Sequence, residues 1–252
     1  MVVLYSKSEI EKIKEASQVV KEVFKQLKEY IKPGISTKDV DKLVEDIIYS
    51  MSAVPSSKGY YGFPGSCCTS VNNVVVHGIP DDKTILKEGD IISVDVVAKK
   101  DGFHSDACRT FPVGKISEEA ERLIKVTKES FFKGVEFARV GNRISDISHA
   151  IQTYVEAAGF GVIREYQGHG VGRNMHEEPS IPNYGRPNRG FRLKPGAVLA
   201  IEPMVTYGDY SIRILPDKWT AVTTDNSIAA HYENTVVITN DEPLILTIED
   251  EA

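Results

Sequence analysis

The sequence predicts an α/β (α+β) fold in which two similar halves each contain two helices followed by two strands and are related by a pseudo-twofold axis. Two observations predict it: this order of elements occurs twice, and residues of the two occurrences align at one offset. Self-similarity of this kind is a signature of repeated architecture. We expect a single domain over residues 1–252, with halves at about 1–115 and 116–252.

Two helices are expected at the start of the first half. Ser6 and Glu9 form a capping-box pair ahead of apolar residues at helical spacing, and Lys32-Pro33-Gly34 stops the run. A second helix begins at Ser36–Thr37 and is amphipathic. Its apolar face is formed by Val40, Val44, Ile47 and Ile48.

The second half begins with the same pair of helices. Ser117 caps a third helix that reaches roughly Arg139. A fourth helix runs from about 144 to 158 and ends at Gly159, because glycine is well suited to the position after a helix. Each pair of helices is followed by β-rich segments, which completes the repeated order.

The halves also align residue by residue at an offset of 107 positions. A common turn sequence would explain one matching segment, but two separated segments share this offset without a gap, which indicates a duplication. In both halves an acid follows the turn glycine by six residues, so the two acids are expected at equivalent points near the axis. The matches are Gly34 with Gly141, Asp39 with Asp146, Leu86-Lys87-x-Gly89 with Leu193-Lys194-x-Gly196, and Asp95 with Glu202.

Composition excludes several classes of protein. The net charge of −6, with both signs mixed along the chain, argues against a nucleic acid as the main partner. No apolar run is long enough to span a bilayer, and the N-terminus lacks the pattern of a secretory signal. The three cysteines cannot all pair and have no CxxC spacing. We therefore expect reduced thiols and a cytoplasmic protein.

A predicted hairpin brings two acids together. Residues 91–98 are apolar except for Ser93 and Asp95, and Asp101-Gly102 is a strong turn signal before a returning strand that holds Asp106. A two-residue turn places Asp95 diagonal to Asp106, and a four-residue turn places them directly opposite. Both acids project from the same face in either register, with Cα atoms roughly 5 to 8 Å apart.

Two buried carboxylates this close need a shared proton or a shared cation. The second half favours the cation, because it adds His169 in a glycine-rich stretch, Glu202 after an apolar strand and Glu233 before one. Four carboxylates and one imidazole suit divalent Mn, Fe, Co or Zn. Two such ions carry the four positive charges that balance the acids, so we expect two metals and not one.

Six segments resemble the methionine aminopeptidases of the type I, short bacterial form, and the resemblance covers nearly the whole chain. Any one of them is a weak signal, but together they are highly specific. The resemblance implies the pseudo-symmetric pita-bread fold, in agreement with the internal repeat. The segments are Val76–Pro80, the hairpin with Asp95 and Asp106, Gly168–Gly172, His176–Pro179, Ala200–Pro203 and Tyr232–Thr235.

The resemblance also implies the metal ligands and the roles of the site residues. Asp106 and Glu233 would bridge both ions, and Glu202 would move the proton of the attacking water. His77 would orient the scissile amide, and His176 would stabilise the oxyanion. The implied metal ligands are Asp95, Asp106, His169, Glu202 and Glu233.

A slot for the methionine side chain is expected from the aromatic residues Tyr60, Phe63 and Trp219, with Cys68 beside them. These aromatic residues could equally be ordinary packing if the motifs were absent. The family often has a cysteine at the position of Ser57 and an aromatic residue at that of Met175, so the shape of this slot is the least defined part.

The family further implies a monovalent cation bound by carbonyl groups near Asn72 and Val74. The expected partners are the N-termini of nascent polypeptides, with ribosome association left open, no direct nucleic-acid or membrane binding, and a monomeric state. Since the family releases methionine before small residues, Val2 predicts that the chain processes its own N-terminus.

Four alternatives remain at this stage. Proline-directed peptidases share the fold but usually carry an extra N-terminal domain, whereas here the first motif helix begins near residue 8. Type II methionine aminopeptidases insert a helical segment that the 31 positions from Glu202 to Glu233 cannot hold. A non-catalytic binding module would have lost metal ligands, and an acid protease built on Asp95 and Asp106 would leave His169 without a role.

Overall fold

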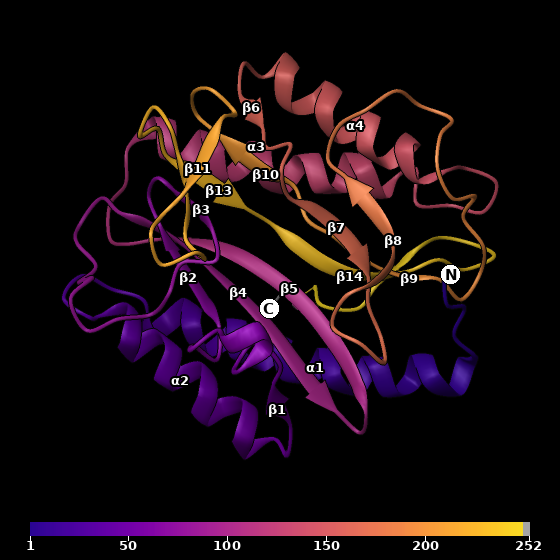
Figure 1. Ribbon diagram of the computed structural model, residues 1–252, viewed down its shortest axis with the longest axis horizontal. Coiled ribbons are helices and arrows are strands. Elements are labelled where there is room, and N and C mark those ends of the chain that lie inside the picture. The colour runs from indigo at the N-terminus through magenta and orange to yellow at the C-terminus, as the bar shows by residue number, and fades with distance from the viewer. Residues whose placement is uncertain (249–252) are drawn as a thin grey trace.

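The computed structural model of the protein describes residues 1–248. Its elements follow the predicted order of two helices and a β-rich segment, twice over. In Figure 1, α1 and α2 lie along the lower edge of the molecule, α3 and α4 along the upper edge, and the central strands run between the two pairs. The helices are α1 (Lys7–Tyr30), α2 (Thr37–Ser50), α3 (Glu118–Val135) and α4 (Ile144–Ala157), with a short 3-10 helix η1 (Tyr60–Gly62).

A nine-stranded sheet forms the centre of the molecule, in the order β1-β4-β5-β14-β9-β7-β8, with β2 paired to β4 and β15 to β14. Its strands are β1 (Val54–Pro55), β2 (Cys68–Val71), β4 (Ile91–Lys100), β5 (Phe103–Pro112), β7 (Gln167–Gly170), β8 (Glu177–Pro182), β9 (Val198–Ile201), β14 (Glu233–Val237) and β15 (Leu244–Ile245).

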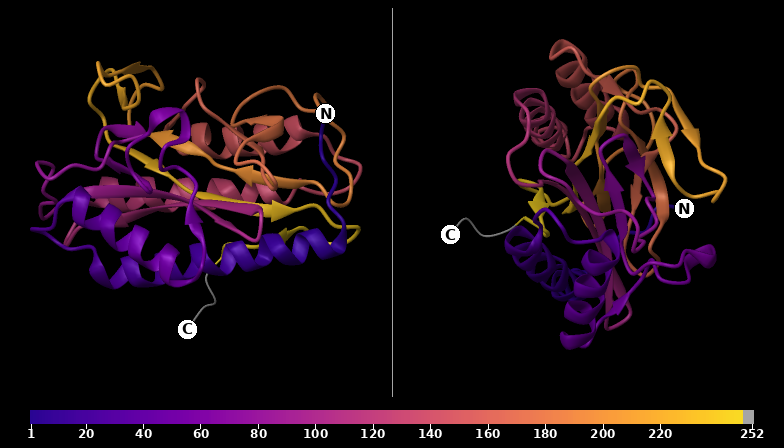
Figure 2. Two further views of the ribbon diagram at one scale, coloured as in Figure 1. Left: turned by 60° about the horizontal axis from the view of Figure 1, so that its bottom comes forward. Right: turned by 90° about the vertical axis from the view of Figure 1, so that its left-hand side faces the viewer.

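Two three-stranded sheets accompany the central one, in the orders β13-β10-β6 and β11-β12-β3. In the side views of Figure 2 the hairpin of β11 and β12 projects from the second half beyond the central sheet. The strands are β3 (Val74–Val76), β6 (Gly161–Val162), β10 (Met204–Thr206), β11 (Ile212–Ile214), β12 (Ala221–Thr223) and β13 (Ala229–His231).

The two halves share a backbone frame. Helices α2 and α4 begin and end at residues 107 positions apart, and the bridges Ser36–Ile85 and Arg143–Arg192 join equivalent residues at the same offset. In both helices an aspartate of the first turn accepts from the backbone amide of the residue before the helix. The duplication predicted from the sequence is thus visible in the fold.

The symmetry axis passes between β5 and β14. The same turn hydrogen bonds link Asp90 to Val113 and Ala197 to Ile238, so β5 maps onto β14 at an offset of 125 positions. Cys108 and Glu233 are 125 positions apart, and they pair directly with each other across the two strands. Equivalent residues can pair in this way only where the axis lies between them, which places the centre of the molecule at this strand pair.

Each half has its own apolar core. The first packs α1 and α2 against β4, with Phe24, Leu27 and Ile92 among its buried residues. The second packs α3 and α4 against the strands of the second half, with Phe131 and Ile151 at its centre. Burial of this kind contributes about 25 cal/mol per Å² of apolar surface removed from water. The two cores hold the central strands from both sides.

Two sequence predictions are sharpened by the structure. The turn at Asp101-Gly102 has two residues, both with positive φ (47° and 84°), which selects the diagonal placement of the hairpin acids. The third helix ends at Val135 and not near Arg139, because Phe137 and Ala138 donate to carbonyls three residues back and form turns. No helix among residues 1–248 is long and apolar enough to cross a membrane.

Candidate active site

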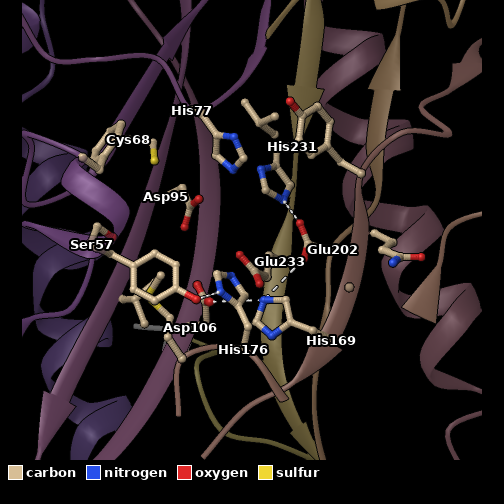
Figure 3. Close-up of a pocket in the computed structure, with 18 of the residues that line it drawn as sticks. Ser57, Cys68, His77, Asp95, Asp106, His169, His176, Glu202, His231 and Glu233 are labelled. Atoms are coloured by element: carbon tan, nitrogen blue, oxygen red, sulfur yellow. Dashed lines mark hydrogen bonds and ion pairs between the residues drawn. The ribbon is translucent and has the colours of Figure 1, made fainter. Parts of the chain in front are cut away.

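A cavity of about 610 Å³ lies between the two halves and is lined by every residue that the sequence analysis assigned to the metals or the substrate. Figure 3 shows acids and histidines from both halves turned toward one space. The predicted residues in its wall are Tyr60, Phe63, Cys68, His77, Asp95, Asp106, His169, His176, Glu202, Trp219 and Glu233.

Strand register delivers the four acids. Asp95 and Asp106 lie on β4 and β5, where Asp95 pairs with Cys108 and Asp106 with Val97, so both face the same side. Glu233 begins β14, the strand that pairs with β5. Glu202 directly follows β9, and Pro203 after it cannot continue the ladder as a donor. The acids therefore converge from strands of both halves.

His169 reaches the acids from β7. Its neighbours Gly168 and Gly170 leave no room for side chains, since a Cβ on either would lie 2.3 Å from a carbonyl oxygen of β9 or β8. The imidazole Nε2 lies 3.6 Å from Asp106 Oδ2 and 3.7 Å from Glu202 Oε1. Its Nδ1 lies 2.9 Å from the carbonyl of Gly170, to which it can only donate. In the neutral ring, Nε2 then turns a lone pair toward the two acids.

Burial disfavours every charge in this cluster when no cation is present. It raises the pKa of Asp95 to about 7, and burial together with neighbouring carboxylates raises the pKa values of Asp106, Glu202 and Glu233 well above the usual range. Burial, assisted by His176, lowers the pKa of His169 to about 3, so its ring is neutral at pH 7. An imidazole lone pair facing crowded carboxylates favours either a proton on the acids or a cation between them.

The donor set fits a divalent cation. Ligand atoms of Asp106, His169 and Glu233 all lie within 4.8 Å of one another. One buried oxygen of Asp95 and one of Asp106 have no hydrogen-bond partner among residues 1–248. Unpaired buried oxygens are costly in a folded protein, and metal coordination is one of the few arrangements that satisfies them.

Two further histidines flank the cluster. His77 follows β3 with a positive φ of 57°, and its ring lies edge-on to Tyr166 at 5.1 Å. Burial lowers the pKa of His77 to about 4. His176 precedes β8, its ring centroid lies 4.3 Å from that of His169, and its Nδ1 lies 2.9 Å from the hydroxyl of Tyr60. Burial also lowers the pKa of His176.

An apolar pocket adjoins the acids. The rings of Phe63 and Trp219 meet edge-on with centroids 5.2 Å apart, and Cys68 pairs across the strands with Asp95. Trp219 is placed by a turn in which Asp217 accepts from the amides of Trp219 and Thr220, both at 2.8 Å. Ser57 and Met175, where the sequence analysis left the shape of the slot least defined, both line the cavity as well.

Comparison with known proteins identifies the family. Residues 11–240 match the model of metallopeptidase family M24. The chain is 56% identical over 248 residues to the methionine aminopeptidase of Clostridium acetobutylicum. This alignment covers 98% of this chain and 99% of that enzyme. The methionine aminopeptidase structure from Thermotoga maritima matches with a TM-score of 0.97 and 45% identity over 99% of this chain and 100% of that one. This chain is a member of the methionine aminopeptidases.

A proline-directed relative shares the fold alone. The prolidase from Pyrococcus furiosus superposes with a TM-score of 0.79 at 22% identity, and this chain covers 66% of its length. Family membership confirms the predicted pita-bread architecture and the metal-dependent aminopeptidase class. It also agrees with a divalent metal centre at the acid cluster.

Sequence reasoning gave no role to His231 or Tyr166, which both line the cavity. His231 ends β13, is 2% exposed, and its Nε2 lies 3.5 Å from Glu202 Oε2. Its position two residues before Glu233 was the available signal, because alternate residues of an extended chain share a face. Tyr166 packs against His77 from a segment between β6 and β7, and no motif marked it.

The segment predicted to bind a monovalent cation is a tight turn. Asn72 has a positive φ of 52°, its side chain donates to Asp90 at 2.8 Å, and its carbonyl accepts from the amide of Ala229 at 2.8 Å. Val74 begins β3 beside it. Binding of a cation by these carbonyls stays a prediction.

Proposed function

We propose that this protein hydrolyses the first peptide bond of polypeptides that begin with methionine followed by a small residue. The observation that carries the proposal is one cavity in which an acid-rich metal site adjoins an apolar slot lined by Phe63, Trp219 and Cys68. A thioether packs favourably against aromatic rings, which suits this slot to methionine.

Five residues would hold the metals: Asp95, Asp106, His169, Glu202 and Glu233. We propose two divalent ions, because four positive charges balance four carboxylates, and Co, Mn, Fe or Zn all suit such donors. When bound, these ions supply an acidified water as nucleophile and positive charge for the substrate carbonyl and free amine. The need for a free amine makes the enzyme an exopeptidase.

The protein's own residues then move protons and orient the substrate. Glu202 is the carboxylate that takes the water proton and carries it toward the leaving amine, with His231 beside it at 3.5 Å. His176 donates to the carbonyl oxygen as negative charge develops there. Burial raises the pKa of Tyr60, so its hydroxyl stays protonated and is able to donate to His176 Nδ1; we propose this tautomer, in which the proton of the neutral ring lies on Nε2. His77 orients the scissile amide.

The wider assignments belong to the same proposal. The ligands come from both halves, about 1–115 and 116–252, so the chain acts as one catalytic domain. Its partners are the N-termini of nascent polypeptides in the cytoplasm. Ribosome association, a monomeric state and the monovalent cation near Asn72 and Val74 stay predictions.

The test is release of methionine from Met-Ala and Met-Leu peptides by chelated protein to which Mn, Fe, Co or Zn is restored. We expect no release after chelation, recovery with metal, and much faster release from Met-Ala. Equal rates on both peptides would contradict the specificity, and full activity after chelation would contradict the metal mechanism.

A further inference from the structure

The N-terminal arm before α1 is mostly exposed, with one exception. Val3 and Leu4 are 39% and 46% exposed, whereas Tyr5 is 5% exposed. The Tyr5 ring packs edge-on to Phe103 at 6.0 Å, and its amide donates to the carbonyl of Gly196 at 2.7 Å. A single residue therefore anchors the arm to the body of the molecule.

The hydroxyl of Tyr5 reaches a loop far along the chain, between β7 and β8. It lies 2.8 Å from both carboxylate oxygens of Glu177, a residue 172 positions away. It also accepts from the amide of Arg173 at 2.9 Å, while Glu177 accepts from the amide of Asn174 at 2.9 Å. Burial raises the pKa of Tyr5, so the hydroxyl keeps the proton that it donates.

The ring itself sits directly on the loop backbone. A Cβ at Gly172 would lie 2.3 Å from the Tyr5 hydroxyl, so only glycine permits this approach. The carbonyl of Gly172 accepts from the amide of His104 at 2.7 Å, which ties the start of the loop to β5. A second contact, the ion pair of Arg173 with Glu9, joins the same loop to the first turn of α1.

This loop carries His176. The residue lines the cavity, and its Nδ1 forms a hydrogen bond with the hydroxyl of Tyr60. Glu177, held by Tyr5, is its direct neighbour and begins β8. The orientation of the His176 backbone thus depends on a carboxylate whose position is set by the N-terminal arm.

We infer that Tyr5 is a positioning residue. Its hydroxyl holds the loop of residues 172–177 so that His176 faces the substrate carbonyl. The inference rests on the proposed function for the role of His176. Loss of the hydroxyl leaves the amide of Arg173 without this acceptor and removes the Tyr5 donor from the Glu177 carboxylate. The amide of Asn174 then depends on a carboxylate that the N-terminal arm no longer holds. The catalytic consequence follows because small displacements of a positioned group cost much of its effect.

The test uses Tyr5→Phe, which keeps the ring and removes the hydroxyl. We expect kcat for a Met-Ala peptide to fall on the order of 10-fold with little change in KM, since the contact of His176 is made as charge develops. Tyr154→Phe is the matched control: the Tyr154 hydroxyl donates to Glu129 at 2.6 Å, far from the cavity, and its loss should leave kcat unchanged.

A double-mutant cycle separates positioning from general damage. In the background of His176→Ala, Tyr5→Phe should cause no further loss of kcat, because the group that Tyr5 positions is gone. An equal loss in both backgrounds would overturn the inference, and so would an unchanged kcat in the single variant.

Hydrogen exchange supplies a measurement that does not need activity. The amides of Arg173 and Asn174 should exchange faster in Tyr5→Phe than in the parent protein, while the amides of α4 should not change. Unchanged exchange at Arg173 would overturn the inference, whether or not the parent protein is active. If the parent protein released no methionine, the proposed function would fail, and this result is separate from the exchange measurement.

Discussion

Two strand positions related by the pseudo-twofold axis carry different chemistry. Cys108 on β5 and Glu233 on β14 are equivalent and pair directly, yet only Glu233 lines the cavity as an acid. Five residues after each of them, Val113 and Ile238 form the same pair of backbone hydrogen bonds with equivalent turns. The backbone frame is therefore duplicated, whereas the side chains facing the cavity have diverged.

The largest contrast is expected at the axis itself. Glu233→Gln removes one of four charges and a predicted ligand, so methionine release should fall by more than about 100-fold, since even partners of ligands commonly cost 10- to 100-fold. Cys108→Ser should leave the rate within a few-fold. The rates on a Met-Ala peptide check this, and similar losses in the two variants would contradict the divergence of the two positions.

The second prediction concerns the stability of metal-free protein. The carboxyl pKa values of the cluster are raised in the fold, so the folded protein retains protons that the unfolded chain releases. The free energy of unfolding therefore falls as pH rises toward and through the raised pKa values. Burial lowers the pKa values of the site histidines, so they oppose this trend until the unfolded chain has lost its histidine protons, at about pH 7.5; above that pH they are neutral in both states.

The Tm of metal-free protein should therefore fall above about pH 7.5, with a slope of up to about 1.4 kcal/mol per pH unit for each retained proton. With Mn²⁺ bound the decline should be smaller, because the cations favour the ionised acids. Thermal melts with and without metal measure the difference. Parallel pH profiles would contradict the binding of the cation at these acids.

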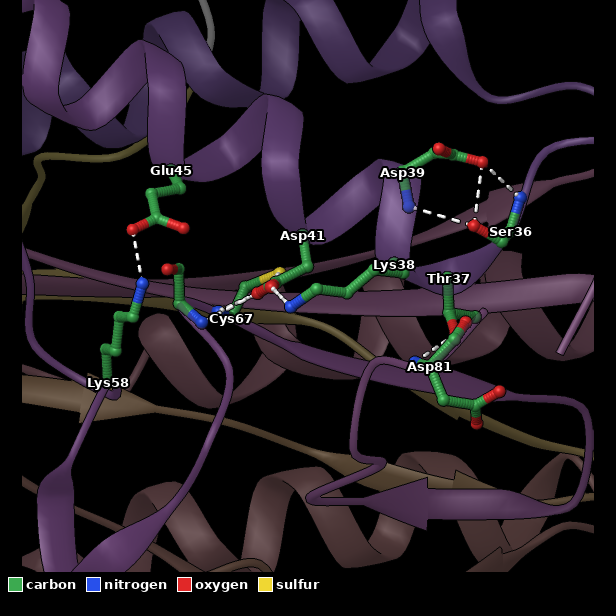
Figure 4. A network of polar contacts seen from close by, with 10 residues as sticks. Ser36, Thr37, Lys38, Asp39, Asp41, Glu45, Lys58, Cys67 and Asp81 are labelled. Atoms are coloured by element: carbon green, nitrogen blue, oxygen red, sulfur yellow. Dashed lines mark hydrogen bonds and ion pairs between the residues drawn. The ribbon is translucent and has the colours of Figure 1, made fainter. Parts of the chain in front are cut away.

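A third contrast lies between α2 and α4. Asp41 on α2 is 1% exposed and accepts from the amides of Ser66 and Cys67 at 2.6 and 3.2 Å, as Figure 4 shows. It also pairs with Lys38 at 2.8 Å. The equivalent residue of α4, Ser148, bonds only within its own helix, to the carbonyl of Ile144 at 3.3 Å. The first half thus fixes the segment before Cys68 with a buried charge.

Asp41→Asn should lower the free energy of unfolding by about 2 kcal/mol and raise KM for methionine peptides, because the segment leading to Cys68 loses its charged acceptor. Ser148→Ala should cost less than about 1 kcal/mol and leave KM unchanged. Urea denaturation and steady-state kinetics check both. Equal costs in the two helices would remove the distinction.

The smallest effects are expected where the halves are alike. Gly34 and Gly141 have φ of 95° and 97°, and a Cβ at either would meet no atom within 4 Å. Alanine at each should cost about 1–2 kcal/mol through backbone strain alone. Denaturation of the two variants should give matching losses. A clear difference would mean that the two turns are not equivalent.

The frame was predictable because its signals are local. Capping boxes, the glycine that ends the fourth helix and the shared offset marked the helices, and strand parity put Asp95 and Asp106 on one face whatever the turn. The turn length itself was open, because an Asp-Gly pair permits more than one loop. The end of the third helix was misplaced because apolar spacing continues into the turn at Phe137 and Ala138.

The sequence predicted those site residues that lie within the recognised motifs, namely the proposed metal ligands and the two flanking histidines. His231 carried a weak signal, since the chain leaves one sheet for another between His231 and Glu233. The contact of Tyr5 with Glu177 carried none, because it joins residues 172 positions apart that belong to no common pattern. Contacts of this range arise from packing and become visible only in three dimensions.

The central claim is that four convergent carboxylates require two divalent cations for function. It is tested most directly by titrating metal-free protein with Mn²⁺ while bound metal and methionine release are measured in the same samples. We predict saturation at two ions per chain, with release from a Met-Ala peptide rising in step with occupancy. Full activity in samples that hold no bound metal would contradict the claim.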